Sequence, residues 1–222
     1  ADGSPTERVA AAVAALIRAA DFYLDLHTGG GRYALAPLAG YTLHPDPSVL
    51  AAQRRMAVAF GFPLAWGTDP SLPGRTLSVA RDAGVPAVYT ESGGGGGFDP
   101  DGVGPLVAGC LGVLAELGLI GPVPRPPPAP RVVEDGRPGS GYLQGCHPAP
   151  ADGFFEPRAG LRVGGWVRTG DRLGAVSDPL GDRPVGVHAA TAGLLVGLHT
   201  RAAVRAGDGL AVVVEADPGD RP

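Results

Sequence analysis

The stretch "DFYLDLHTGG", residues 21–30, places an apolar run directly before a histidine and a series of glycines. The run at residues 22–27 has the length and composition of a buried β-strand, so we expect it to deliver the imidazole of His27 to the point where the chain turns. In open α/β sheets, binding and catalytic side chains gather beyond the carboxyl ends of the strands. A single histidine after a strand is also commonly a hydrogen-bonded structural or surface residue, so position alone does not decide its role.

The stretch "VPAVYTESGGGGG", residues 85–97, repeats this pattern. We expect a strand at residues 85–90, followed by the ionisable Glu91 and then by glycines, so that two strands deliver His27 and Glu91 to one edge of the sheet. A carboxylate beside a metal-activated water can act as general base and then pass the proton to a leaving amine. Polyglycine also occurs in ordinary mobile loops, so the spacing indicates this chemistry without being specific to it.

Helical segments separate these strands and predict an α/β fold. In "SPTERVAAAVAALIRAAD", Ser4 is a candidate N-cap, Pro5 the first helical residue and Glu7 the partner in a capping box, which predicts a helix over residues 5–20. Further helices are expected at residues 47–61, 75–84 and 101–118, each closed by a glycine. This alternation predicts a mainly parallel sheet that is flanked by helices.

The character of the sequence changes at the proline-rich segment "GPVPRPPPAPR", residues 121–131. Such a segment is neither regular helix nor central strand, and short apolar runs with turn signals follow it. We therefore expect an α/β domain at residues 1–120, a linker at 121–130 and a small all-β module at 131–222. Within this module, "RTGDRLG" (168–174) and "RAGDGLA" (205–211) are near-copies, which predicts two related strand-turn-strand units.

Composition narrows the class of partner. The chain has 222 residues, 44% of them hydrophobic, and a net charge of -4 from 18 basic and 22 acidic residues. This balance argues against nucleic acid and anionic membranes as partners and favours a small molecule, while a homo-oligomer is compatible with it. The two cysteines, Cys110 and Cys146, lack CxxC spacing and are too few for a disulfide framework, which favours a reducing, cytoplasmic location.

Three segments together carry a resemblance to a known family: "SPTERVAAAVAALIRAADFYLDLHTGG", "GVPAVYTESGGGG" and "ADGFFEPRAGLRVGGWVRTGDRLGAVSDPLGD". They resemble the succinylglutamate desuccinylase/aspartoacylase family, whose catalytic core is similar to zinc carboxypeptidases. The resemblance implies a zinc-dependent hydrolase, a deacylase that cleaves the amide bond of an N-acylated amino acid or similar small amide. It implies that His27 is the last of three zinc ligands and Glu91 the general base. It also implies a carboxypeptidase-like α/β fold, with a C-terminal module similar to lipoyl and biotinyl barrels.

The sequence departs from the family pattern in one respect. The family takes its first two zinc ligands from an HxxE motif near the start of the domain, followed by a DxNR-type substrate-binding motif, and neither motif is present. Residue 1 aligns just beyond these motifs, so we expect the sequence to begin partway through a longer protein. Asp25 shares a strand face with His27 and is expected either to orient it or to be a buried structural residue. Arg32 and Arg75 are candidates for binding a substrate carboxylate, with neither assigned.

Two other classes of function compete with a hydrolase. The first is a non-catalytic family member that binds a small molecule or a protein without metal. The second is a carrier protein, which the likeness of the C-terminal module to lipoyl and biotinyl domains suggests. Carrier domains need an attachment lysine, and all 18 basic residues are arginine, so this class is excluded.

Overall fold

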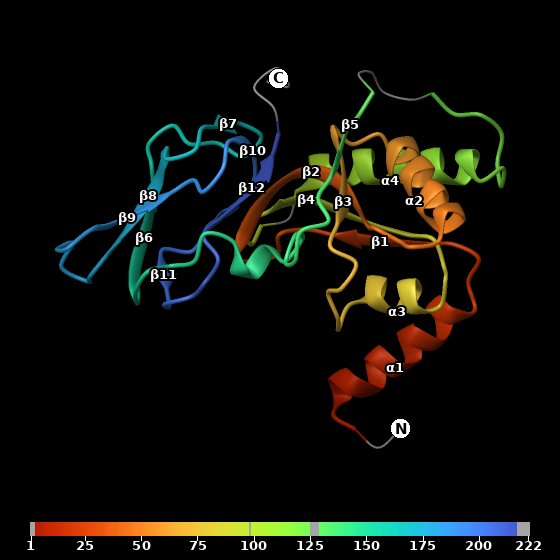
Figure 1. The fold of residues 1–222 in the computed structure, drawn as a ribbon, viewed down its shortest axis with the longest axis horizontal. Helices are drawn as coiled ribbons and strands as arrows, with labels where there is room; N and C mark the ends of the chain where they lie inside the picture. The colour runs from red at the N-terminus through yellow and green to blue at the C-terminus, as the bar shows by residue number, and fades with distance from the viewer. Residues whose placement is uncertain (1–2, 98, 125–128, 217–222) are drawn as a thin grey trace. The chain divides into compact units, whose positions relative to one another are not determined.

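The computed structural model describes residues 3–97, 99–124 and 129–216 (Figure 1). Its first elements are α1 (Pro5–Arg18), β1 (Tyr23–His27), β2 (Tyr33–Thr42), α2 (Pro47–Phe60), β3 (Leu64–Thr68), α3 (Thr76–Asp82), β4 (Ala87–Gly94), α4 (Pro100–Glu116) and β5 (Arg131–Glu134). They are followed by the 3-10 helix η1 (Leu143–Gly145), β6 (Gly153–Pro157), β7 (Trp166–Val167), β8 (Arg172–Ser177), β9 (Val185–His188), β10 (Gly193–His199), β11 (Ala203–Val204) and β12 (Ala211–Glu215).

The chain forms two compact units whose segments interleave in sequence. Unit 1 takes residues from 1–27, 38–91 and 101–141, and unit 2 takes residues from 28–37, 92–100 and 142–222. Strand β5 belongs to unit 1 because it pairs in parallel with β3. The domain boundaries at 1–120, 121–130 and 131–222 stay a prediction, and residues 125–128 of the expected linker lie outside the described residues.

Unit 1 contains the mainly parallel sheet that the sequence predicts. Its strands lie in the order β1-β4-β2-β3-β5, and the pairs β1–β4, β2–β3 and β3–β5 are parallel. Strands β2 and β3 are not among the strands that the sequence predicts. Both are buried runs: residues 64–68 are all buried, as are residues 38–42 of β2. Strands covered on both faces lack the alternation of apolar and polar residues that makes a strand recognisable.

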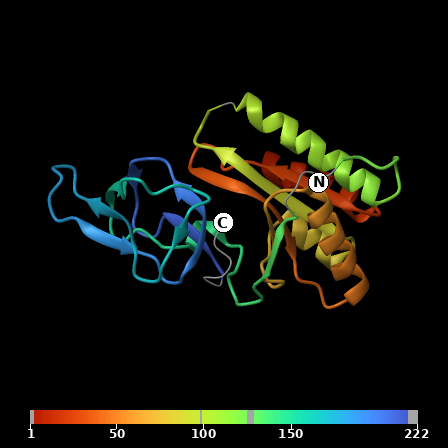
Figure 2. The same ribbon diagram turned by 90° about the horizontal axis from the view of Figure 1, so that it is seen from above.

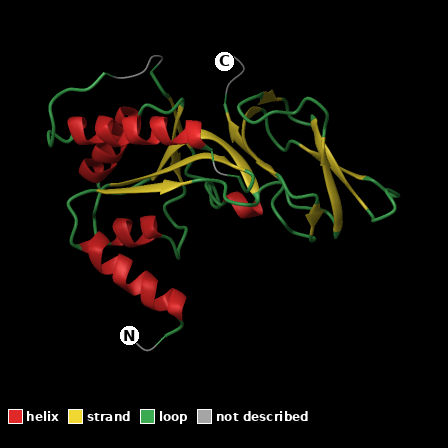
Figure 3. Cartoon of the chain, turned by 180° about the vertical axis from the view of Figure 1, so that it is seen from behind, coloured by secondary structure: helices red, strands yellow, loops and turns green. Residues whose placement is uncertain are grey.

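Helices cover both faces of this sheet (Figures 1 and 3), with α2 and α4 on one face and α1 and α3 on the other. The core on the first face joins both helices to β2, β3 and β4. Its buried members are Ala39, Tyr41, Met56, Ala57, Phe60, Phe62, Ala65, Val88 and Val113. The second face has a smaller core, which consists of Ile17, Ala80, Val85 and Ala87.

The predicted helix ends agree closely with the structure. The Ser4 hydroxyl accepts a hydrogen bond from the Glu7 N–H, and the Glu7 carboxylate accepts one from the Ser4 N–H, which confirms the capping box of α1. This helix ends at Arg18, two residues earlier than expected. Helix α2 ends at Phe60, and its C-cap residue Gly61 adopts a left-handed conformation with φ of 82°.

Helices α2 and α4 approach each other closely because glycines lie between them (Figure 2). A Cβ atom placed on Gly112 would lie 2.3 Å from the carbonyl oxygen of Ala59, and one on Gly109 would lie 2.4 Å from the Phe60 ring. Any side chain at Gly112 would therefore push the two helix backbones apart.

The described residues of unit 2 form strands and loops with one short 3-10 helix (Figure 3). Strands β11, β6, β8 and β9 form an antiparallel sheet in that order, and β10 pairs antiparallel with β12 and β7. The two near-copies form matching turns, which confirms their predicted relation. The Asp171 carboxylate accepts the Arg168 N–H, and the Asp208 carboxylate accepts the Arg205 N–H, each at 2.8 Å.

Among the described residues, no helix has the length and apolar character that crossing a membrane requires.

Candidate active site

His27 and Glu91 occupy paired positions at one edge of the unit 1 sheet. Strands β1 and β4 are parallel, and their register sets His27 opposite Glu91. The structure therefore brings together the two residues that the sequence predicts at a common edge. Their expected roles, metal ligand and general base, stay predictions.

Asp25 and Thr76 hold the imidazole of His27 in place. The Nε2 atom of His27 lies 2.9 Å from Oδ1 of Asp25, and the Thr76 hydroxyl donates a hydrogen bond to the other carboxylate oxygen. The Asp25 side chain is 15% exposed, whereas that of His27 is 48% exposed. The ring is thus anchored on its buried side and accessible on the other, an arrangement typical of histidines whose orientation is set by a carboxylate.

The hydrogen bond between Asp25 and His27 favours the charged form of each side chain, so it raises the pKa of His27 and lowers that of Asp25. The hydrogen bond to Asp25 raises the pKa of His27, burial opposes it, and the charges of Asp25 and Glu91 add to the increase. Burial by itself would raise the pKa of Asp25, but hydrogen bonds from His27 and Thr76 outweigh burial and lower it.

Glu91 is a buried carboxyl group without a hydrogen-bond partner at one oxygen. Its Oε2 atom is shielded from solvent and no described group bonds to it. Burial raises the pKa of Glu91 to about 7, with His27 opposing the increase and Asp25 adding to it. A carboxyl group with a pKa near neutrality can both accept and release a proton at physiological pH, as a general base requires.

Arg75 lies at the start of α3, beside Thr76, and its Nε and Nη2 atoms are buried without a hydrogen-bond partner among the described residues. Tyr89, two residues before Glu91 on β4, is buried, and its pKa is raised mainly by burial, with the charge of Glu91 adding and that of Arg75 opposing. Arg32, the other candidate for carboxylate binding, belongs to unit 2. There it lines a cavity of about 550 Å³ with Tyr33 and Asp208.

Thr76 and Tyr89 are residues of this site that the sequence patterns above do not predict. Tyr89 was detectable, because alternation along a strand puts residues 89 and 91 on the same face. Thr76 was not, since its bond to Asp25 joins residues 51 positions apart.

The described residues do not complete a zinc site by themselves. Hydrolytic zinc sites have about three protein ligands. Within residues 3–97, 99–124 and 129–216, no group of three or more His, Cys, Asp or Glu side chains is placed to hold a metal ion. A zinc ion at His27 would therefore need ligands beyond those that this structure brings together.

Residues 1–117 match the model of the succinylglutamate desuccinylase/aspartoacylase catalytic domain. The chain therefore belongs to this family, as its motifs predict, and the characterised relatives are deacylases.

The relatives agree with this assignment. The chain is 30% identical over 220 residues to N-alpha-acetyl-L-2,4-diaminobutyric acid deacetylase of Halomonas elongata, which covers 96% of the chain and 62% of the relative. The product-bound ectoine utilization protein EutE (DoeB) of Ruegeria pomeroyi is similar in structure, with a TM-score of 0.82, 27% identity, and coverage of 97% of the chain and 64% of that protein. A succinylglutamate desuccinylase/aspartoacylase of Rhodobacter sphaeroides has a TM-score of 0.84 at 25% identity, and the match covers 97% of the chain and 65% of that protein. The chain thus spans less than two thirds of the length of these relatives.

Proposed function

We propose that this protein is a zinc-dependent hydrolase that cleaves the amide bond of an N-acylated amino acid or similar small amide. The observation that carries the proposal is the register of β1 and β4, which pairs His27 with Glu91 at one sheet edge. The substrate class follows from the deacylase relatives, one of which is a deacetylase of N-alpha-acetyl-L-2,4-diaminobutyric acid.

In this proposal His27 is one of the zinc ligands, and Asp25 fixes its orientation. Zinc, when bound, would polarise the amide carbonyl and acidify water. Because the described residues supply too few ligands, the remaining ligands come from residues that this structure does not bring to His27. The Asp25–His27 contact supports the ligand role, since metal-binding histidines commonly bond a carboxylate through the second ring nitrogen.

Glu91 is the general base. It removes a proton from the attacking water and delivers that proton to the nitrogen of the leaving amine. Burial supports this role, because it raises the pKa of Glu91 to about 7 and makes both transfers accessible near neutral pH.

The proposal extends to the rest of the chain. We propose that the C-terminal part of the chain, expected at residues 131–222, contains the all-β module that resembles lipoyl and biotinyl domains. The strand content of residues 142–216 and the two matching turns support this. The partner is a small molecule and the location cytoplasmic. Light scattering would measure whether the protein forms the homo-oligomer with which its composition is compatible.

Hydrolysis of a panel of N-acetyl and N-succinyl amino acids, including N-alpha-acetyl-L-2,4-diaminobutyrate, tests the function. The product of the complete gene should release free amine from at least one member. Glu91→Gln should reduce kcat by about 10²-fold or more, because a positioned base contributes about this much. A folded protein that binds these amides without cleaving any of them would favour the rival function, a non-catalytic binding module.

A further inference from the structure

A cavity of about 550 Å³ lies within unit 2 and is lined by polar side chains and glycines. Its walls come from three segments far apart in sequence: residues 29–33, the residues at η1 and the turn at 207–209. Cavities that hold small molecules measure roughly 300–1,000 Å³, so this one is large enough. Every lining residue belongs to unit 2, whereas His27 and Glu91 belong to unit 1. The cavity therefore shares no residue with the candidate active site.

Two side chains of opposite charge, Arg32 and Asp208, line this cavity. Among the described residues, no ion pair or hydrogen bond joins these two side chains to each other. Both act on the phenol of Tyr33: burial raises its pKa, the charge of Asp208 adds to the increase and that of Arg32 opposes it. The Asp208 carboxylate accepts the Arg205 N–H through Oδ2, which leaves Oδ1 for a ligand.

Backbone hydrogen bonds fix the wall that carries Arg32. The N–H of Tyr33 donates to the carbonyl of Gly29 at 3.0 Å, and the N–H of Gly95 donates to the carbonyl of Tyr33 at 2.9 Å. The carbonyl of Arg32 itself accepts the N–H of Thr200 at 2.7 Å. The backbone at Arg32 is thus held before any ligand binds, which reduces the entropy lost on binding.

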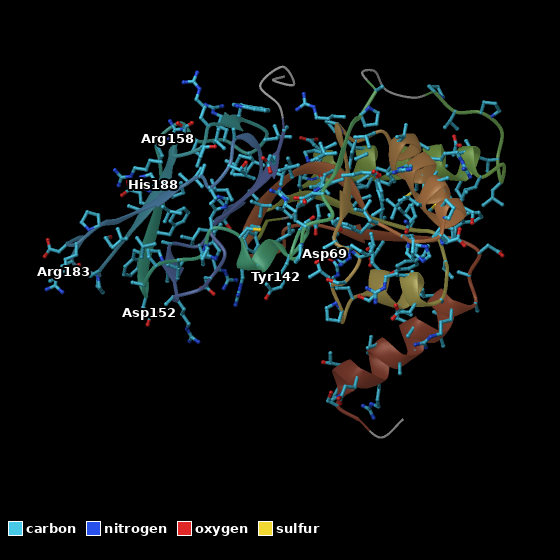
Figure 4. All side chains as sticks on the ribbon, in the orientation of Figure 1. Asp69, Tyr142, Asp152, Arg158, Arg183 and His188 are labelled. Atoms are coloured by element: carbon cyan, nitrogen blue, oxygen red, sulfur yellow. The ribbon has the colours of Figure 1, made fainter. Side chains whose placement is uncertain are left out.

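Tyr33 joins the wall of Arg32 to the wall of Asp208. Its hydroxyl donates to the carbonyl of Gly209 at 2.9 Å, and its ring meets the ring of His199 edge to face, with centroids 5.4 Å apart. Tyr142, which is labelled in Figure 4, precedes η1 and belongs to the third wall. The spacing of the two charged side chains is therefore set by ordered backbone on both sides.

The turn of Asp208 is one of the two near-copies, and a single residue distinguishes its surroundings from those of the other. Arg172 follows Asp171 in the first copy, whereas Gly209 follows Asp208 in the second. A Cβ atom on Gly209 would lie 2.6 Å from the carbonyl oxygen of Gln144. The glycine thus lets the backbone of η1 pack directly against the second turn and form the cavity there.

We propose that this cavity binds the zwitterion of a free α-amino acid, with the carboxylate at Arg32 and the ammonium group at Asp208. A guanidinium group presents a planar fork of donors that matches two carboxylate oxygens, and a carboxylate oxygen accepts hydrogen bonds from ammonium. A zwitterion offers both charges on one small molecule. The inference goes beyond the proposed function, because none of these residues takes part in the proposed hydrolysis.

Calorimetric titration of the complete protein with three probes tests the inference. L-alanine carries both charges, L-lactate has a hydroxyl in place of the ammonium group, and L-alaninamide lacks the carboxylate. L-alanine should bind about 10-fold or more tightly than either analogue, as expected for loss of one hydrogen bond between charged groups. An analogue that binds as tightly as L-alanine would overturn the inference.

Charge-removing variants assign the two ends of the ligand. Arg32→Gln should weaken L-alanine about 10-fold and abolish its advantage over L-alaninamide, and Asp208→Asn should do the same relative to L-lactate. Asparagine keeps an oxygen for the turn bond to Arg205. The matched controls are Arg205→Gln, whose side chain does not line the cavity, and Asp171→Asn, which serves the equivalent turn. Equal affinity for L-alanine in all four variants would overturn the inference.

His27→Asn distinguishes this cavity from an amino acid held by a metal at the sheet edge. The affinity for L-alanine should stay within about twofold of the wild-type value, because the cavity residues are unchanged. Loss of L-alanine binding in His27→Asn would place the amino acid at the candidate zinc site and overturn the inference. Binding that depends on Arg32 and Asp208 in a protein without hydrolytic activity would instead keep the inference and remove the proposed function.

Discussion

His27 and Glu91 are paired across two parallel strands, with the Cα position of one opposite that of the other. Backbone hydrogen bonds between β1 and β4 fix this relationship, so it does not depend on either side chain. Substituting one of the two residues should therefore change the chemistry of the edge while leaving its geometry intact.

Asp25→Asn should lower the pKa of His27, because the hydrogen bond to Asp25 is the largest cause of its increase. NMR titration of the histidine ring in the chelator-treated chain measures this pKa. Asp171→Asn is a matched control, since Asp171 serves a turn of unit 2. A His27 pKa that is unchanged in Asp25→Asn would contradict the assigned contact.

The same pair predicts how stability depends on pH. Because the pKa of His27 is raised on folding, the stability that its charged form contributes is complete below the unfolded pKa, about 6.5, and is lost as pH rises through the folded pKa of His27. Because the pKa of Asp25 is lowered on folding, the stability that its carboxylate contributes is lost as pH falls through the folded pKa of Asp25. The free energy of unfolding lost in Asp25→Asn should thus be greater near pH 5.5 than near pH 9, and urea denaturation at both values measures it.

Glu91→Gln should stabilise the metal-free chain at high pH. The pKa of Glu91 is raised from 4.5 to about 7, so the folded state binds more protons than the unfolded state between these values, and stability falls as pH rises through them. Glutamine does not titrate. The difference between the two proteins should grow from pH 4.5 to 7 and level off above, reaching on the order of 3 kcal/mol. A difference independent of pH would mean that Glu91 is not desolvated.

Tyr41→Phe should cost about 1 kcal/mol, the usual contribution of one hydrogen bond. The buried Tyr41 hydroxyl donates to the Glu134 carboxylate at 2.6 Å, and Arg54 binds the same carboxylate with two N–H groups. This network ties β5 to the sheet. Tyr142→Phe, at an exposed side chain, is the control and should be close to neutral. Equal effects of the two substitutions would show that the network contributes nothing.

Gly112→Ala should destabilise unit 1 much more than Gly104→Ala, although both glycines lie in α4. A Cβ at Gly112 would meet the Ala59 carbonyl oxygen at 2.3 Å, whereas one at Gly104 meets no atom within 4 Å. Forcing atoms into a packed interface costs about 1–3 kcal/mol. The two melting temperatures measure the difference, and similar values would contradict the close approach of α2 and α4.

Local signals explain which parts of the fold the sequence predicts. Ser4 and Glu7 cap the first turn of α1, and Gly61 caps the last turn of α2. Each signal acts on neighbouring residues, so these helix ends are predictable from the sequence. Strand β5 is not, because only its pairing with β3, more than 60 residues earlier, makes Arg131–Glu134 part of the parallel sheet.

The candidate site likewise contains residues that the sequence predicts and a residue that only the folded structure identifies. His27 and Glu91 are detectable because each ends an apolar strand and precedes glycine. The absence of a hydrogen-bond partner for two Arg75 nitrogens among the described residues is a property of the folded chain: among many surface arginines, only three-dimensional packing distinguishes one whose nitrogens are buried.

The zinc content of the complete gene product and of its variants tests whether His27, rather than Glu91, holds the metal. His27 and Glu91 are proposed to differ in role, one holding the metal and the other moving a proton. Elemental analysis should find about one zinc per chain in the wild type and in Glu91→Gln, and substantially less in His27→Asn, since only the last change removes a ligand. Full zinc occupancy in His27→Asn, or loss of zinc in Glu91→Gln, would contradict the assignment of these two residues.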